Sequence, residues 1–221
     1  RMITVIGLGV EKNDLTKRGE QALLQAVKDG RPIVVRTVNT VSYQTVVEMG
    51  IAHESLDSVY ESSRNFATLA KNLAKAVAER GENAVYLVDG SATEDNSVKA
   101  LLKRMRGKVE IIDGVSRTTA LVRAAGFVGC SYTAVSAYEL IENAQSGNLS
   151  LPLIVYDLDD RALAGDIKLI LGDLFGEETV VKYLNGGNAK KAYLYELDRQ
   201  KGYDYTSAVS IEAVDLLEKQ R

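Results

Sequence analysis

The sequence predicts a two-lobed α/β protein, with a parallel α/β lobe in its first half and a mixed-sheet α+β lobe in its second. In the first half, short apolar runs alternate with segments of helical period, which is typical of βαβ units. In the second half, the last two apolar runs follow each other with no helix between them, which indicates a mixed sheet. With 221 residues, 46% of them hydrophobic, the chain can bury a sizeable core.

The first half begins with a βαβ pattern, in which Asp14 or Thr16 can cap the first helix and Gly30 ends it. Strands are predicted at 2–7, 32–37, 84–88 and 108–113, and helices at 14–30, 40–50, 58–80, 96–107 and 116–126. The second half predicts strands at 132–137, 151–158, 178–186, 190–198 and 205–212, helices at 137–144 and 160–176, and a loop at 145–150. The change of pattern places the lobes at residues 1–114 and 115–221.

Two glycine turns follow predicted strands directly. "VIGLGVEKNDLT" (5–16) contains Gly7 and Gly9, and "VYLVDGSATED" (85–95) contains Gly90. Ligands of open α/β sheets bind where strands end, and glycine lets a ligand approach the backbone closely. Lys12 stands where the third glycine of a dinucleotide-binding G-x-G-x-x-G would be, and no phosphate-binding G-K-[ST] follows. We therefore expect Gly7, Gly9 and Gly90 to border one crevice at the strand ends.

Several chemistries find little support in the sequence. His53 is the only histidine and Cys130 the only cysteine, so a structural zinc site is excluded, and we expect Cys130 to be a small buried residue. The carboxylate pairs fit helix caps better than Mg²⁺ ligands; they are Glu94–Asp95, Asp159–Asp160 and Glu177–Glu178. No metal is expected.

Charge and hydropathy limit the classes of partner that the sequence predicts. The net charge is −3, and the basic cluster at 99–108 fits the solvated face of a helix, so nucleic acid is not the expected partner. No run approaches the roughly 20 apolar residues of a membrane span, and the N-terminus has no signal-peptide layout. These features favour a soluble, cytoplasmic protein.

Four segments together resemble the tetrapyrrole (corrin and porphyrin) methylase family. They are "ITVIGLG…DLT", the turn after "VYLVDG", "VEIIDGVSRTTALVRAAG" and "PLIVYDLDDRALAGDIKLIL", in the order seen in that family and over nearly the whole chain. The sequence is most similar to the methylase-like N-terminal domain of MazG-type nucleotide pyrophosphohydrolase proteins. The resemblance implies two α/β lobes, S-adenosylmethionine in the cleft between them, and a homodimer.

The family's motifs match in part. Gly7, Leu8 and Gly9 match the start of its first glycine loop, but Val10-Glu11-Lys12 replaces the usual Pro-Gly-Asp, and Gly90-Ser91-Ala92 replaces Gly-Asp-Pro. In "IDGVSRTTA", Asp113 replaces a proline and Arg117 a serine, and Tyr156-Asp157 falls where the family lines the adenosine pocket.

The resemblance implies a S-adenosylmethionine-dependent methyltransferase-like protein. Its cofactor-binding residues would be Gly7, Leu8, Gly9, Val88, Asp89, Gly90, Ser91, Ala92, Ser116 and Tyr156. Arg36 and Arg117 could face an acidic substrate through charge-assisted hydrogen bonds, or form surface or interlobe ion pairs. The sequence identifies no catalytic base.

The alternative is a non-catalytic binding or regulatory domain of a MazG-type protein. The Glu-Glu-x-x-Glu metal motif of such hydrolases is absent from this sequence, and the terminal "VDLLEKQR" is a charged helical pattern that could lead into a C-terminal hydrolase domain. Three carboxylates near the second turn, Asp89, Glu94 and Asp95, would repel a tetrapyrrole bearing many carboxylates. We therefore expect no tetrapyrrole methylation. The turn "VDGSATED" is still expected to contact a ligand, with an affinity for S-adenosylmethionine below that of active relatives.

Overall fold

The chain divides into two compact units, Arg1–Arg117 and Thr118–Arg221. The structure is a computed structural model that describes residues 2–143 and 149–213. The charged stretch 214–221, most of the predicted loop 145–150, and the predicted end of a helix at Ala144 lie outside the described residues.

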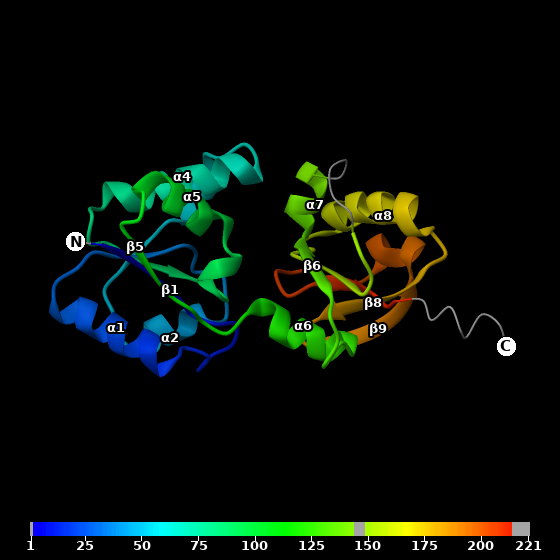
Figure 1. The fold of residues 1–221 in the computed structure, drawn as a ribbon, viewed down its shortest axis with the longest axis horizontal. Helices are drawn as coiled ribbons and strands as arrows, with labels where there is room; N and C mark the ends of the chain where they lie inside the picture. Colours follow the sequence, from blue (N-terminus) through cyan, green and yellow to red (C-terminus); the bar gives the residue numbers. More distant parts are fainter. Residues whose placement is uncertain (1, 144–148, 214–221) are drawn as a thin grey trace. The chain divides into compact units, whose positions relative to one another are not determined.

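The first unit is built on a parallel sheet of five strands with helices on both faces. The strands are β1 (Ile3–Gly7), β2 (Ile33–Val35), β3 (Glu54–Ser55), β4 (Val85–Val88) and β5 (Val109–Ile112), in the order β3-β2-β4-β1-β5. Its helices are α1 (Lys17–Lys28), α2 (Tyr43–Glu48), α3 (Asp57–Glu61), α4 (Phe66–Glu79), the 3₁₀ turn η1 (Ala92–Glu94) and α5 (Asn96–Met105). Figure 1 shows α1 and α2 on one side of this sheet and α4 and α5 on the other.

Alternation along the strands divides the core of this unit into two layers. Val5 and its register partner Tyr86 pack toward α4 and α5, whereas Ile6 and its partner Leu87 pack toward α1 and α2. Because both faces are covered, the central strands are apolar except for Thr4 in β1, as is typical of parallel sheets. The predicted parallel α/β lobe is confirmed.

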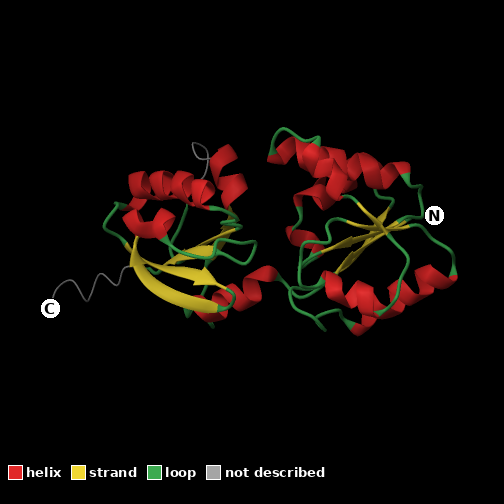
Figure 2. Ribbon diagram, turned by 180° about the vertical axis from the view of Figure 1, so that it is seen from behind, coloured by secondary structure: helices red, strands yellow, loops and turns green. Residues whose placement is uncertain are grey.

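The second unit has a mixed sheet, as the sequence predicts. Its strands are β6 (Thr133–Ser136), β7 (Leu153–Tyr156), β8 (Val180–Asn185), β9 (Asn188–Tyr193) and β10 (Ala208–Ile211), in the order β6-β7-β10-β8-β9. Only β6 and β7 pair in parallel; β10 is antiparallel to β7 and β8, and β8 to β9. On one face pack α7 (Ala137–Asn143), α8 (Arg161–Phe175) and the 3₁₀ helix η2 (Leu194–Arg199), and on the other α6 (Arg117–Ala125). Figure 2 shows these helices beside the strands.

Helix caps account for three residues that the sequence singles out. The Thr16 hydroxyl accepts a hydrogen bond from the amide of Gly19 at the start of α1. Asp95 and Asp160, each from a carboxylate pair, cap α5 and α8 by accepting amide hydrogen bonds in the first turn. These two carboxylates therefore belong to helix ends, as predicted.

Two predicted elements are wrong in their extent. The helix predicted at 58–80 is divided into α3 and α4, because Asn65 caps a new helix through the amide of Thr68 at 2.8 Å. The strand predicted at 190–198 ends at Tyr193 and continues as η2, which buries Leu194 and Leu197 against α8. The alternation in "YLYELD" imitates a strand, but two leucines three residues apart suit a 3₁₀ turn equally well.

Two smaller features also differ from expectation. The short edge strand β3 lies within a polar stretch, so hydrophobic periodicity gave no sign of it. Cys130 is exposed, in a turn after α6, where we expected a buried residue.

Within residues 2–143 and 149–213, no helix is both long enough and apolar enough to cross a bilayer.

Candidate functional site

The candidate site lies where β1 and β4 end, side by side, in the first unit. After β1 the chain enters α1, which packs on one face of the sheet, and after β4 it enters α5, which packs on the opposite face. Two neighbouring strands whose connections leave toward opposite faces form the switch point at which open α/β sheets bind ligands. Gly7–Gly9 and Val88–Ala92 both lie at this edge.

The glycines of the two turns are in direct contact through their backbones. The Gly9 amide donates to the Gly90 carbonyl at 3.2 Å, and the Gly90 amide to the Gly9 carbonyl at 2.7 Å. Both residues have positive φ, +78° and +65°, which glycine adopts without a steric penalty. Gly9 and Gly90 therefore lie on neighbouring strands rather than on opposite edges of the sheet, and their amides bond within the protein. The crevice expected beside Gly7, Gly9 and Gly90 stays a prediction.

Gly114 is a third member of this contact, and it was absent from the predicted site. A Cβ at Gly7 would lie 2.6 Å from the Gly114 nitrogen, and a Cβ at Gly114 would lie 2.5 Å from the Gly7 oxygen and 2.6 Å from the Gly90 oxygen. The segments after β1, β4 and β5 thus interlock at glycines. The signal was present in the sequence, since Gly114 comes directly after the strand predicted at 108–113, at the end of an apolar run like Gly7.

Three predicted cofactor residues turn their side chains away from this edge. Leu8 belongs to the core layer beneath α1 and α2, and Val88 and Ala92 to the layer beneath α4 and α5. A ligand here would meet only their backbones. The Val10 and Glu11 amides, which follow the first glycines, both donate to the Asp14 carboxylate, at 3.1 and 2.8 Å.

Ser91 and Ser116 both form hydrogen bonds to carboxylates. The Ser91 hydroxyl donates to Asp113 at 3.0 Å, which links the turn after β4 to the end of β5. The Ser116 hydroxyl donates to Glu94, whose carboxylate also accepts from the amides of Ser91 and Arg117. These polar contacts join the turn after β4 to the segment after β5.

Arg36 is held in a mostly buried ion pair. Its Nε lies 3.0 Å from Asp95, and its Nη1 donates to the Tyr60 hydroxyl at 2.6 Å. Burial lowers the pKa of Arg36, but Asp95, Asp89 and the tyrosines Tyr60 and Tyr86 together outweigh that effect and hold the pKa above its ordinary value. Desolvation raises the pKa of Tyr60 to about 12, so Tyr60 serves the guanidinium as a neutral acceptor.

Arg117 lies across the turn after β4. Its Nη1 is 3.8 Å from an Asp89 oxygen, with both side chains largely buried, and its Cγ would be 2.9 Å from a Cβ on Gly90. Both arginines form ion pairs, but these pairs are mostly buried and lie within the first unit, where surface or interlobe pairs were expected. Their predicted contact with an acidic substrate stays a prediction. Their partners Asp95 and Asp89 leave less positive charge for an acidic substrate.

Tyr156 belongs to the second unit, at the end of β7. It is half-buried and packs against the cluster that contains Leu121, Ala125 and Phe127. Asp157 follows with φ of +62° and accepts a hydrogen bond from Ser136 at 3.0 Å.

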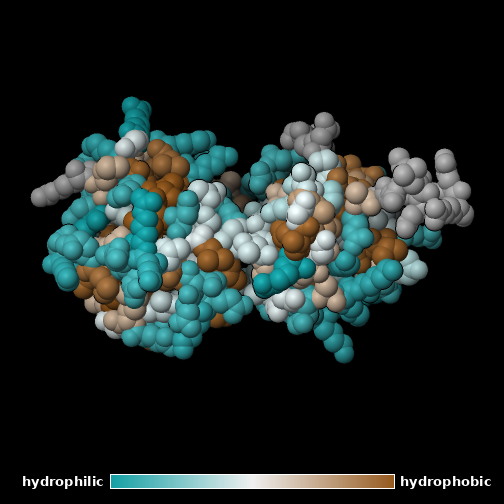
Figure 3. All heavy atoms as spheres, turned by 60° about the horizontal axis from the view of Figure 1, so that its bottom comes forward, coloured by the Kyte–Doolittle hydropathy of each residue, from teal (hydrophilic) through white to brown (hydrophobic). Residues whose placement is uncertain are grey.

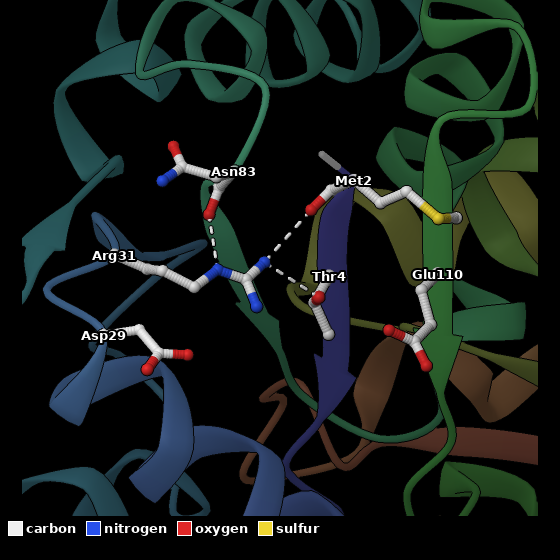
Figure 4. A pocket seen from close by; sticks show the side chains of 6 residues that line it. All are labelled: Met2, Thr4, Asp29, Arg31, Asn83 and Glu110. Atoms are coloured by element: carbon white, nitrogen blue, oxygen red, sulfur yellow. Dashed lines mark hydrogen bonds between the residues drawn. The ribbon is translucent and has the colours of Figure 1, made fainter.

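A cavity of about 450 Å³ lies at the other end of the first sheet, where β1, β4 and β5 begin (Figure 4). The Arg31 guanidinium spans β1 and β4 there, donating to the carbonyls of Asn83 and Met2 and to the Thr4 hydroxyl. Asp29 and Glu110 complete its lining. The cavity contains no residue of the predicted site, and its guanidinium serves to tie the strand starts together.

His53 and the acidic residues form no metal site in the described part of the chain. The His53 ring bonds the Tyr43 hydroxyl at 2.8 Å and the Ile51 carbonyl at 2.7 Å. Among residues 2–143 and 149–213, no group of three or more His, Cys, Asp or Glu side chains is placed to hold a metal ion.

Solved structures share this fold over nearly the full chain. The methyltransferase CobJ matches with a TM-score of 0.61 at 16% identity, over 96% of this chain and 94% of its own. Diphthine synthase matches with a TM-score of 0.60 at 17% identity, over 100% and 94%. Uroporphyrin-III C-methyltransferase from Thermus thermophilus, solved with S-adenosylhomocysteine, matches with a TM-score of 0.62 at 15% identity, over 96% and 98%.

Comparisons of sequence alone find no relative. No family profile matches the chain, and no curated protein matches it. The similarity therefore lies in the architecture: a parallel five-stranded unit followed by a mixed-sheet unit. The protein has the two-lobed α/β fold of the tetrapyrrole methylases.

Proposed function

We propose that the protein binds S-adenosylmethionine, and that the strand-end surface of its first unit carries most of the binding residues. The supporting observation is the glycine interlock at the β1–β4 switch point, in a fold that a uroporphyrin-III C-methyltransferase uses with S-adenosylhomocysteine. The proposed contacts in the first unit are the backbones of Gly7–Gly9 and Val88–Ala92, with Ser116. Tyr156 stays a prediction from the sequence.

The sulfonium of this cofactor supplies an already activated methyl group. The residues of this chain would orient the cofactor and exclude water rather than provide an acid or a base. Asp89, beside Gly90, offers negative charge to the ligand's ammonium or sulfonium. We propose that Arg36 and Arg117 mainly hold Asp95 and Asp89 in place, and that they contact an acidic substrate only as part of these pairs.

A second candidate is ligand binding without methyl transfer, as in a regulatory domain of a MazG-type protein. It is favoured by the internal pairing of the polar groups at the strand ends, since the Gly9 and Gly90 amides each donate to the other residue's carbonyl and Glu94 accepts three donors. An acceptor that carries many carboxylates would meet Asp89, Glu94, Asp95 and Asp113. We expect no methylation of a tetrapyrrole.

Calorimetry with S-adenosylmethionine and S-adenosylhomocysteine tests the proposal, using Gly90→Ala and Gly107→Ala. Both glycines have positive φ, +65° and +85°, so both variants carry similar backbone strain. Only at Gly90 would the added Cβ meet other residues, the Arg117 side chain at 2.9 Å and Glu94 at 3.2 Å. We expect the parent to bind, Gly107→Ala to bind equally, and Gly90→Ala to bind at least about tenfold more weakly.

The outcomes separate the two candidates. A parent protein that binds neither ligand at millimolar concentration would sink the proposal. Binding without transfer of a labelled methyl group to any acceptor in a cell extract would support the regulatory candidate.

We also propose a homodimer. Large apolar side chains are exposed in both units, among them Leu24 and Val47 in the first and Leu169 and Leu174 in the second. Figure 3 shows apolar residues at several places on the face that it presents. Light scattering at micromolar concentration should give twice the mass of the chain, and a monomeric mass would count against the proposal.

A further inference from the structure

We propose that Glu94 is a positioning residue that holds the turn after β4 and the segment before α6 together as one ligand-binding surface. For the ligand this rests on the proposed function, but the positioning itself is a property of the free protein.

The carboxylate of Glu94 bridges two segments that are distant in sequence. One oxygen accepts the amides of Ser91, at 3.3 Å, and of Arg117, at 3.2 Å, and the other accepts the Ser116 hydroxyl. The first donor belongs to the turn after β4, and the other two precede or begin α6. Two of the residues so fixed, Ser91 and Ser116, are proposed ligand contacts.

The chemistry of the carboxylate suits this role. An ionised acceptor makes stronger hydrogen bonds than a neutral one, and Arg117 is the first residue of α6, where the helix dipole favours negative charge. Glu94 is itself held, because it lies in η1, whose first residue, Ala92, is buried in the core. The buried start of η1 thus fixes the Glu94 carboxylate in contact with both segments.

The carboxylates near Glu94 form other ion pairs and hydrogen bonds. Asp95 pairs with Arg36 and caps α5, and Asp89 lies by the Arg117 guanidinium. Asp113 adds a link to the same turn through the Ser91 hydroxyl. Glu94 joins the turn to the residues directly before the boundary of the first unit, which ends at Arg117. It therefore also fixes where the chain leaves that unit.

Hydrogen exchange on the free protein tests the positioning, using Glu94→Gln with Glu82→Gln as the matched control. Glu82 pairs with Lys108 at 3.1 Å on the surface, so its variant removes the same charge from an exposed ion pair. In Glu94→Gln we expect amides at 90–92 and at 115–118 to exchange at least about tenfold faster, and to do so together. Unchanged exchange in both segments would overturn the proposal.

Ser116→Ala provides a second variant in case Glu94→Gln does not fold. It removes one of the three donors and keeps the carboxylate. We expect faster exchange at 115–118, with 90–92 less affected. Equal exchange in Ser116→Ala and the parent at 115–118 would contradict the bridge.

Calorimetry with S-adenosylhomocysteine tests the consequence for the ligand. We expect the affinity of Glu94→Gln to fall about tenfold while its melting temperature stays close to that of Glu82→Gln. Equal affinity of Glu94→Gln and the parent would overturn the role in binding. If the parent itself does not bind, the proposed function fails, and the exchange experiment still decides whether Glu94 positions the two segments.

Discussion

Two buried serines differ in their hydrogen bonds: Ser207, directly before β10, and Ser210, within β10. Ser207 and Ser210 are each 1% exposed. The Ser207 hydroxyl accepts from the Asp204 amide and the Asn185 side chain and contacts the Tyr183 hydroxyl at 3.1 Å. The Ser210 hydroxyl has no hydrogen-bond partner among the described residues. A buried hydroxyl without a partner contributes desolvation cost and no bond.

We therefore expect Ser210→Ala to leave the free energy of unfolding unchanged or to raise it by up to about 1 kcal/mol. Ser207→Ala should lower it by roughly 1–3 kcal/mol, because three groups lose a partner. Urea denaturation of both variants measures the difference. A Ser210→Ala loss as large as that of Ser207→Ala would show that Ser210 has a bonding role.

We expect Asp57 to make the first unit sensitive to acid. Burial alone raises the pKa of Asp57, but hydrogen bonds from the hydroxyls of Ser55 and Thr37 and the amide of Val38 outweigh it, so the pKa lies below its ordinary value. A carboxyl whose pKa is depressed by folding stabilises the protein above its unfolded pKa, and this contribution is lost as the pH falls through its folded pKa.

The Asp57→Asn variant should therefore lose less stability than the parent between about pH 5 and pH 2. Its unfolding free energy at neutral pH is expected to be lower, so the slope against pH is the quantity to compare. Equal slopes in urea titrations at several pH values would mean that Asp57 does not carry this dependence.

At the candidate site, the sequence predicted where residues lie better than which ion-pair and hydrogen-bond partners they have. Gly7, Gly9 and Gly90 could be placed at one edge because each follows an apolar run, and parallel strands end together. The ion pairs of Arg36 with Asp95 and of Arg117 with Asp89 could not be predicted, because they depend on the direction of side chains that leave different strands. From the sequence, Glu94 is one member of a carboxylate pair. Its hydrogen bond with Ser116 could not be predicted, because the fold brings together two residues that are distant in sequence.

At the scale of elements, Asn65 shows how one cap divides a helical pattern. The residues from 58 to 80 have a helical period throughout, yet the chain leaves the helix after Glu61 and re-enters it at Phe66. Asn65 is extended, and its side chain accepts the Thr68 amide. "SSRN" was the available signal, since serine and asparagine favour caps over helix interiors.

We expect Asn65→Ala to lower the free energy of unfolding by about 1 kcal/mol, and Asn65→Asp to leave it nearly unchanged, because aspartate caps equally well. Thermal and urea denaturation measure both. A neutral Asn65→Ala would indicate that packing of α4 alone fixes its start.

The interior strands and the edge strands β5 and β6 were predicted well, whereas the edge strand β3 and the end of the edge strand β9 were not. β1, β4 and β7 are apolar because covered strands must be, so composition alone reveals them. β3 is two residues long and polar, and η2 lies where alternating tyrosine and leucine favoured a strand. In both, pairing and packing with distant residues decide the conformation.

At the scale of the whole molecule, the two units have separate cores. The apolar layers of the first unit lie within residues 3–112, and those of the second within residues 121–211. We propose that residues 1–117 fold without the rest. The fragment should show a cooperative thermal transition and dispersed amide resonances, whereas a non-cooperative transition would mean that the first unit depends on the second.

The strand order of the second sheet also has a consequence for synthesis. β10 is the last described strand, yet it lies between β7 and β8 and supplies hydrogen bonds to both. Domains fold as units while the chain emerges, starting from the N-terminal side. All five strands of the first unit have been synthesised by residue 112. The second sheet, in contrast, lacks its central strand β10 until Ile211 has left the ribosome. We expect that during that interval the facing edges of β7 and β8 can pair with other nascent chains.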